Sequence, residues 1–194
     1  MIMNDKGKGG LLLLCGATVL LFGMMIAEFT FPGYSVSQNY ISDLAVGPMA
    51  SSLVFTVAVI LFGFSALVGA VLLRQKSRKS LLWLFLSLSA IGAIGVGVIN
   101  ENFIPAVHAI FALMAFLFGN LAAIYSYKMV RPPLSYLFAC LGIVGLLALV
   151  LLASGIFLGL GVGGMERMIF YPAMFWTLGF GVYLLAEENA VGTG

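Results

Sequence analysis

Residues 28–48 read EFTFPGYSVSQNYISDLAVGP, and this stretch is the longest weakly hydrophobic passage in the chain. It contains Glu28 and Asp43, two of the seven acidic residues, and two prolines. Apolar runs flank it on both sides, and each is close to the roughly 20 residues that a helix needs to cross a bilayer. The passage therefore predicts a connection at one membrane face, with a membrane-spanning segment before and after it.

The composition excludes a soluble globular domain. Hydrophobic residues make up 62% of the 194 residues and charged residues only 8%, whereas soluble domains have about a quarter charged residues. The mean hydropathy is +1.16. These values predict a polytopic membrane protein. The basic residues lie in short runs at the ends of apolar segments, so we expect no nucleic-acid partner.

Six apolar runs predict an all-α bundle of six transmembrane helices that forms one domain over residues 1–194. Each run must be helical, because an unpaired backbone amide in hydrocarbon costs several kcal/mol. The first run has no small-x-small cleavage site before Glu28 and is read as a retained helix rather than a signal peptide. The predicted spans cover residues 10–27, 51–73, 80–99, 105–127, 134–158 and 168–186.

The basic residues predict the orientation of these spans. Eight of the nine Lys and Arg residues fall on one side of the predicted membrane, and Arg167 falls on the other. The positive-inside rule makes the basic side cytoplasmic. We therefore expect a multi-pass protein of the cell membrane with both termini in the cytoplasm. Four acidic residues fall on the outer side, either as part of a site or because the inner connections are already basic.

Within the opening passage, residues 34–46 have a helical pattern and predict a short interfacial helix between the first two spans. One face of this helix would be apolar, formed by Val36, Tyr40, Ile41 and Leu44. Ser42 and Asp43 fall on the opposite face. Two alternatives remain open for them: they face water, or they face inward over the bundle.

His108, the only histidine, lies about one turn into the fourth predicted span, whose first turn contains Pro105, a residue suited to that position. The second, fourth and sixth spans all begin on the outer side. Three helix N-termini, each with a partial positive charge, then point at one layer, and this arrangement favours anions such as phosphate or carboxylate. His108 is either a hydrogen-bonded structural residue or a functional one.

A glycine-rich turn is predicted before Glu166 and Arg167, which open the sixth span. Glu166 is either a favourable charge at a helix N-terminus or part of a ligand site. Arg167 has three alternatives: it extends to the interface, it pairs with an outer carboxylate, or it holds an anionic head group. Pro172 predicts a bend that opens a lateral gap for a lipid.

Three sequence passages together resemble the integral membrane proteins of the family called domain of unknown function 998. These are YSVSQNYISDL (residues 34–44), FIPAVH (103–108) and GGMERMIFYP (163–172). The resemblance covers nearly the whole chain in matching order. It implies a six-helix bundle in a prokaryotic cytoplasmic membrane and no established activity. It places Ser42, Asp43, His108, Glu166 and Arg167 on matching motif positions.

The function that we predict first is the binding of a lipid or another amphipathic small molecule in a polar pocket at the outer face. Arg167, Glu101 and Glu166 are its predicted ligand-binding residues, and membrane lipids are the predicted partners. The alternative is an intramembrane hydrolase or transferase acting on a lipid head group. Its predicted catalytic residues are Ser42 as nucleophile, His108 as general base and either Asp43 or Glu101 as the group that orients the histidine.

A transporter or channel is less favoured, because ion-coupled carriers place ionisable residues or broken helices near the membrane midplane. The predicted spans carry no charge there. We expect no cofactor and no metal site, since one histidine with carboxylates is a weak zinc pattern. The sequence does not indicate the oligomeric state.

Overall fold

The computed structural model describes residues 3–76 and 81–192, and in this part of the chain the fold is entirely helical. The predicted all-α bundle is thereby confirmed. The helices are α1 (Asp5–Phe29), α2 (Met49–Lys76), α3 (Leu82–Val98), α4 (Pro105–Tyr125), α5 (Leu134–Ala153) and α6 (Gly161–Gly192). Two short 3-10 helices, η1 (Ser42–Ala45) and η2 (Ser126–Lys128), complete the described elements.

Five of these helices, α1, α2, α4, α5 and α6, are long and apolar enough to cross a membrane. Helix α3 is also apolar but has only 17 residues. Its predicted start at residue 80 lies outside the described residues. By length and composition the chain is a multi-pass membrane protein. The cell membrane and the cytoplasmic position of both termini stay predictions from the basic residues.

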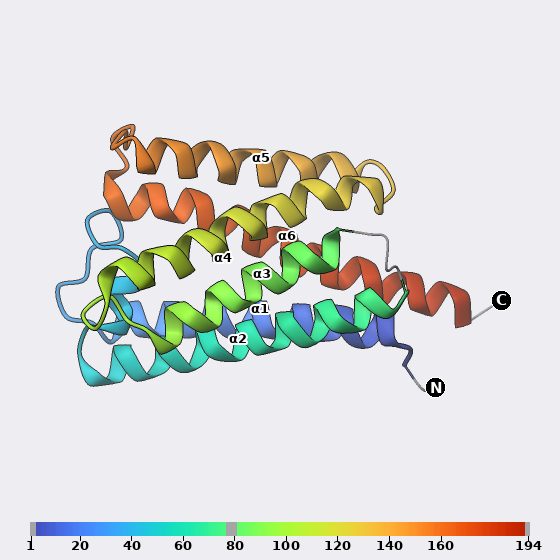
Figure 1. Cartoon of the computed structure of the whole chain (residues 1–194), viewed down its shortest axis with the longest axis horizontal. Helices are drawn as coiled ribbons and strands as arrows, with labels where there is room; N and C mark the ends of the chain where they lie inside the picture. The colour runs from blue at the N-terminus through green and yellow to red at the C-terminus, as the bar shows by residue number, and fades with distance from the viewer. Residues whose placement is uncertain (1–2, 77–80, 193–194) are drawn as a thin grey trace.

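Helices α1, α2, α3, α4 and α6 form a closed ring, in which each packs against the next and α6 packs against α1. Helix α5 lies outside this ring, against α4 and α6. In Figure 1 the connections α1–α2, α3–α4 and α5–α6 lie together at one end of the bundle, which we call the loop end. Helix α1 begins and α6 finishes at the opposite end, the terminal end. Helices α2, α4 and α6 therefore all begin at the loop end.

The sixth helix begins earlier than predicted. It starts at Gly161, whereas the sequence placed the start of the span at residue 168. Gly161 has a positive φ of 75°, which glycine adopts without a steric penalty, and the glycines that follow it are helical. Glu166 and Arg167 consequently lie in the second turn of α6 instead of opening it. Pro172 lies inside the helix.

Of the short interfacial helix predicted for residues 34–46, only the 3-10 helix η1 (Ser42–Ala45) is present. This segment consists of turns and η1. Its predicted apolar face is divided, since Val36 and Tyr40 are exposed whereas Ile41 and Leu44 are buried. The physical reason is that its polar groups bond across the turns and to α6, in place of the regular hydrogen bonds of a helix. Asp43 Oδ2 accepts from Asn39 Nδ2 at 2.8 Å and from the backbone N–H of Tyr40 at 3.0 Å.

Candidate functional site

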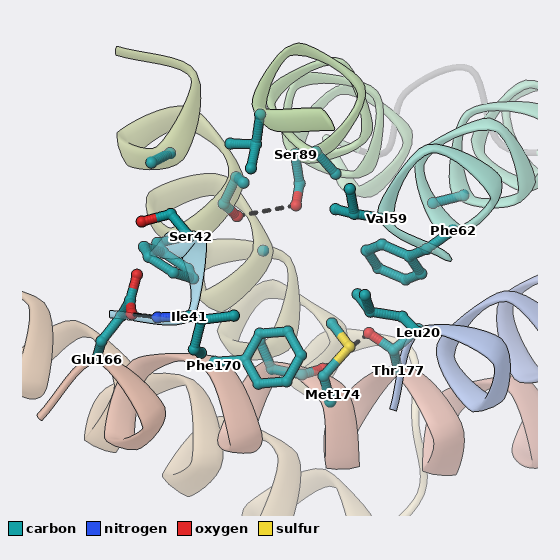
Figure 2. Close-up of a pocket in the computed structure, with 18 of the residues that line it drawn as sticks. Leu20, Ile41, Ser42, Val59, Phe62, Ser89, Glu166, Phe170, Met174 and Thr177 are labelled. Atoms are coloured by element: carbon teal, nitrogen blue, oxygen red, sulfur yellow. Dashed lines mark hydrogen bonds between the residues drawn. The ribbon is translucent and has the colours of Figure 1, made fainter. Parts of the chain in front are cut away.

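A cavity of about 80 Å³ lies inside the five-helix ring. Its walls come from α1, α2, α3, α4, α6 and residues 41–42, and no described residue of α5 lines it. Most of the lining is apolar, and Figure 2 shows Leu20, Phe62 and Phe170 among the side chains around it. At the loop end the lining becomes polar, with Ser42, His108 and Glu166. Two hydroxyl residues elsewhere in the lining, Ser89 and Thr177, donate to backbone carbonyls. The cavity thus has a mostly apolar body and a polar end.

Glu166 is positioned at this polar end by the second turn of α6. The residue is 6% exposed, and its Oε2 accepts a hydrogen bond from the backbone N–H of Ile41, drawn as a dashed line in Figure 2. Within the described part of the chain, Oε1 has no hydrogen-bond partner. The hydrogen bond from Ile41 thus holds the carboxyl group in place at the cavity wall.

Ser42 and Glu101 join the α1–α2 connection to the α3–α4 connection at the loop end. Ser42 Oγ donates to Glu101 Oε2 at 3.0 Å. Burial and the neighbouring carboxyl group of Asp43 raise the pKa of Glu101, while the Ser42 hydroxyl and His108 act in the opposite direction. Asp43, Glu101 and His108 are therefore close enough to interact electrostatically.

His108 lies in the first turn of α4 and is 6% exposed. Its Nδ1 is 2.7 Å from the backbone carbonyl oxygen of Ile99. A carbonyl oxygen only accepts hydrogen bonds, so we assign the ring proton to Nδ1. Nε2 is then an acceptor in the neutral ring, and no described residue donates to it. This geometry holds the imidazole in one orientation at the edge of the cavity.

Arg167 is almost completely buried, with 3% of its side chain exposed, and forms an ion pair with Glu28 on α1. Nη2 also donates to Tyr34 Oη at 2.7 Å. Nη1 donates to three backbone carbonyl oxygens, those of Val36 and Gly163 at 3.0 Å and that of Asn39 at 3.4 Å. We call Arg167, Glu28, Tyr34 and these three carbonyls the Arg167 cluster. Nε is buried without a described partner, but Arg167 is not among the residues that line the cavity.

The structure brings most of the predicted site residues together. Ser42, His108 and Glu166 line the polar end of the cavity, with Asp43 and Glu101 beside them. Arg167 instead pairs with the carboxylate of Glu28, so of the three alternatives stated for it the structure has the ion pair. The Ser–His hydrogen bond of a catalytic pair is not formed among the described residues, because the Ser42 hydroxyl donates to Glu101. The described residues also contain no group of three or more His, Cys, Asp and Glu arranged to hold a metal ion.

Two partners of Arg167, Glu28 and Tyr34, were not named individually from the sequence. A signal for the first existed. Glu28 is an acidic residue at the end of an apolar run, and Arg167 is the only basic residue predicted on the same side. Two isolated opposite charges in a membrane protein tend to pair. For Tyr34 the sequence carries no comparable signal.

The raised pKa of Glu101 predicts how stability depends on pH. The folded protein keeps the Glu101 proton above the ordinary pKa of 4.5. The stability that protonated Glu101 contributes is therefore fully present below the ordinary pKa. It is lost as the pH rises through the raised pKa of the folded protein. We expect Glu101→Gln to flatten the decrease in melting temperature between pH 4 and pH 8, measured by thermal unfolding in detergent. Asp5→Asn at the terminal end is the control, and an unchanged slope in Glu101→Gln would contradict this expectation.

Comparison with known proteins gives one match. A family model described as "Protein of unknown function (DUF998)" matches residues 14–183, which is most of the chain. No curated protein and no solved structure matches the chain.

Proposed function

The chain belongs to the DUF998 family of integral membrane proteins of unknown function, and we propose that it binds an amphipathic small molecule inside the helix bundle. The apolar part of this molecule occupies the cavity, and its polar part lies among Ser42, His108 and Glu166 at the loop end. A membrane lipid or a single-chain molecule of similar build meets this description.

The observation that carries the proposal is the cavity, with its apolar body and single polar end. An apolar cavity of roughly 150 Å³ in a protein core binds benzene. A volume of about 80 Å³ is roughly half of that, so it suits a short segment of one chain rather than a whole acyl chain. Lipid tails are as apolar as leucine, so a chain that moves from the bilayer into the cavity gains little. Selectivity is expected to come from the polar end.

The hydrolase alternative has less support than binding. A serine nucleophile needs a general base within hydrogen-bond reach, and the Ser42 hydroxyl donates to Glu101 instead of to His108. His108 Nδ1 is engaged by the backbone carbonyl of Ile99, so the predicted carboxylate that orients the imidazole is not at this position. Binding requires none of these residues to react, and we therefore place it first.

The test uses Trp176, which lines the cavity, as a fluorescent reporter. Trp83→Phe removes the other of the two tryptophans. The protein is placed in nanodiscs of zwitterionic lipid and titrated with 8-bromooctan-1-ol, whose bromine quenches tryptophan at short range. We expect saturable quenching. Ala112→Phe fills the cavity and should weaken the affinity for the alcohol about tenfold, since overpacking costs about 1–3 kcal/mol.

The matched control is Leu113→Phe, one residue further along α4. Leu113 is 50% exposed and does not line the cavity, so the same residue type is introduced on the outer surface of the helix. Its quenching curve should equal that of the parent protein. Quenching that rises without saturation, and equally in all three proteins, would show simple partition into the bilayer and would refute the proposal.

A further inference from the structure

The polar side-chain atoms at the end of the cavity that lack a described hydrogen-bond partner are acceptors. Glu166 Oε1 has no partner among residues 3–76 and 81–192, although Glu166 is 6% exposed and its other oxygen is already used by Ile41. His108, also 6% exposed, presents Nε2 because Nδ1 is engaged with Ile99. Both side chains line the cavity. Neither atom is among the fully buried side-chain atoms without a partner in the described residues, so both acceptors are open to the cavity, and a ligand that donates hydrogen bonds can reach them.

The carboxyl groups at this end also favour a ligand that donates hydrogen bonds over an anionic one. Glu101 and Asp43 place two more carboxyl groups near Glu166, and the Ser42 hydroxyl is already directed at one of them. Arg167 follows Glu166 in the chain, but its terminal nitrogens are engaged in the Arg167 cluster. The part of the cavity wall that the structure describes contains no lysine or arginine. An anionic head group would meet several carboxyl groups and no free cation.

We propose that the bound amphiphile has a protonated amine as its head group, held between Glu166 Oε1 and His108 Nε2. This inference rests on the proposed function and specifies the ligand class of that same site. An ammonium group offers three donors and no acceptor, and its hydrogen bond to a carboxylate is charge-assisted. A hydroxyl head group makes weaker bonds to the same atoms. A carboxylate or phosphate head group is rejected.

The anionic head group expected from the sequence is thereby replaced. That expectation used the three helix N-termini at the loop end, which do favour negative charge. In the structure acidic side chains already lie at these N-termini: Glu166 in the second turn of α6, and Glu101 and Asp43 beside the start of α4. The remaining preference at the cavity is for a cation.

The experiment uses the Trp176 reporter with three ligands of equal chain length: 8-bromooctylamine, 8-bromooctan-1-ol and 8-bromooctanoate. At pH 7 these carry a positive, a neutral and a negative head group. We expect the amine to bind about tenfold or more tightly than the carboxylate, which corresponds to 1.4 kcal/mol, with the alcohol between them. Glu166→Gln keeps an acceptor for Ile41 and should remove most of the preference for the amine over the alcohol.

A matched control removes a carboxylate elsewhere. Glu187→Gln, at the terminal end beside Lys6, should leave the order of the three ligands as in the parent protein. Saturable binding with equal affinity for all three, or tightest for the carboxylate, would overturn the amine while the proposed function stands. An amine preference that survives Glu166→Gln would overturn the role of Glu166. If no ligand quenches in a saturable way, the proposed function itself fails. The comparison of ligands on the parent protein remains decisive should Glu166→Gln not fold.

Discussion

Replacing Arg167 by alanine should lower the free energy of unfolding by about 3–5 kcal/mol, the usual cost of removing one member of a buried ion pair. The side chains of Arg167 and Glu28 are 3% and 20% exposed. Without the guanidinium, the Glu28 carboxylate loses its partner, and the cluster's carbonyl groups lose their donor. Reversible unfolding in mixed micelles with increasing dodecyl sulfate measures the change.

Two variants make this result specific. Arg74→Ala removes an exposed guanidinium that lies 4.5 Å from the centre of the Trp83 ring, and should cost only about 0.5–1 kcal/mol. Glu28→Gln keeps an oxygen for Arg167 and should cost less than Arg167→Ala. Equal stability of Arg167→Ala and Arg74→Ala would refute the structural role of the cluster. Loss of amphiphile binding without loss of stability would assign Arg167 to the ligand instead.

Gly163→Ala should release the α1–α2 connection from α6. A Cβ at Gly163 would lie 2.0 Å from the carbonyl oxygen of Asn39 and 2.6 Å from that of Val36. Both atoms belong to the backbone, and the N–H of Gly163 donates to the carbonyl of Ser37 at 3.0 Å, so the connection has to move. Overpacking costs about 1–3 kcal/mol, against a gain of up to about 1 kcal/mol from the better helix propensity of alanine.

The measurement is limited proteolysis with chymotrypsin, which cleaves after exposed aromatic residues such as Tyr40 in this connection. Cleavage should be several times faster in Gly163→Ala than in the parent protein. Gly164→Ala is the matched control in the same helical turn, because its Cβ would meet only Leu160, at 2.9 Å, and no atom of the connection. Equal cleavage rates in the two variants would contradict the close packing at Gly163.

The helices could be predicted from the sequence because hydrocarbon leaves the backbone few alternatives to a helix. The ends of the helices could not, since contacts distant in sequence decide them. Residues 161–164 look like a flexible turn, and their helical state is accompanied by close packing of the α1–α2 connection against Gly163. The α1–α2 connection has the hydrophobic periodicity of a helix, but it forms turns because Asp43 and Asn39 bond across them.

The polar end of the candidate site could be predicted from the sequence, but the apolar cavity inside the helix ring could not. The polar residues of three connections were expected at one end of the bundle, and Ser42, Glu101 and His108 do meet there. The pairing of Arg167 with Glu28 joins residues 139 positions apart and depends on the packing of α1 against α6. Neither the closure of the ring nor the cavity follows from hydropathy, because both depend on how side chains fill the space between helices.

The position of α5 outside the ring has a practical consequence for labelling. Cys140 lies on α5 and is exposed, in a helix of which no described residue touches the cavity. With Cys15, the other free and exposed cysteine, replaced by serine, a spin label or fluorophore attached at Cys140 would follow the motion of the bundle. It would do so without occupying the space that a bound molecule needs.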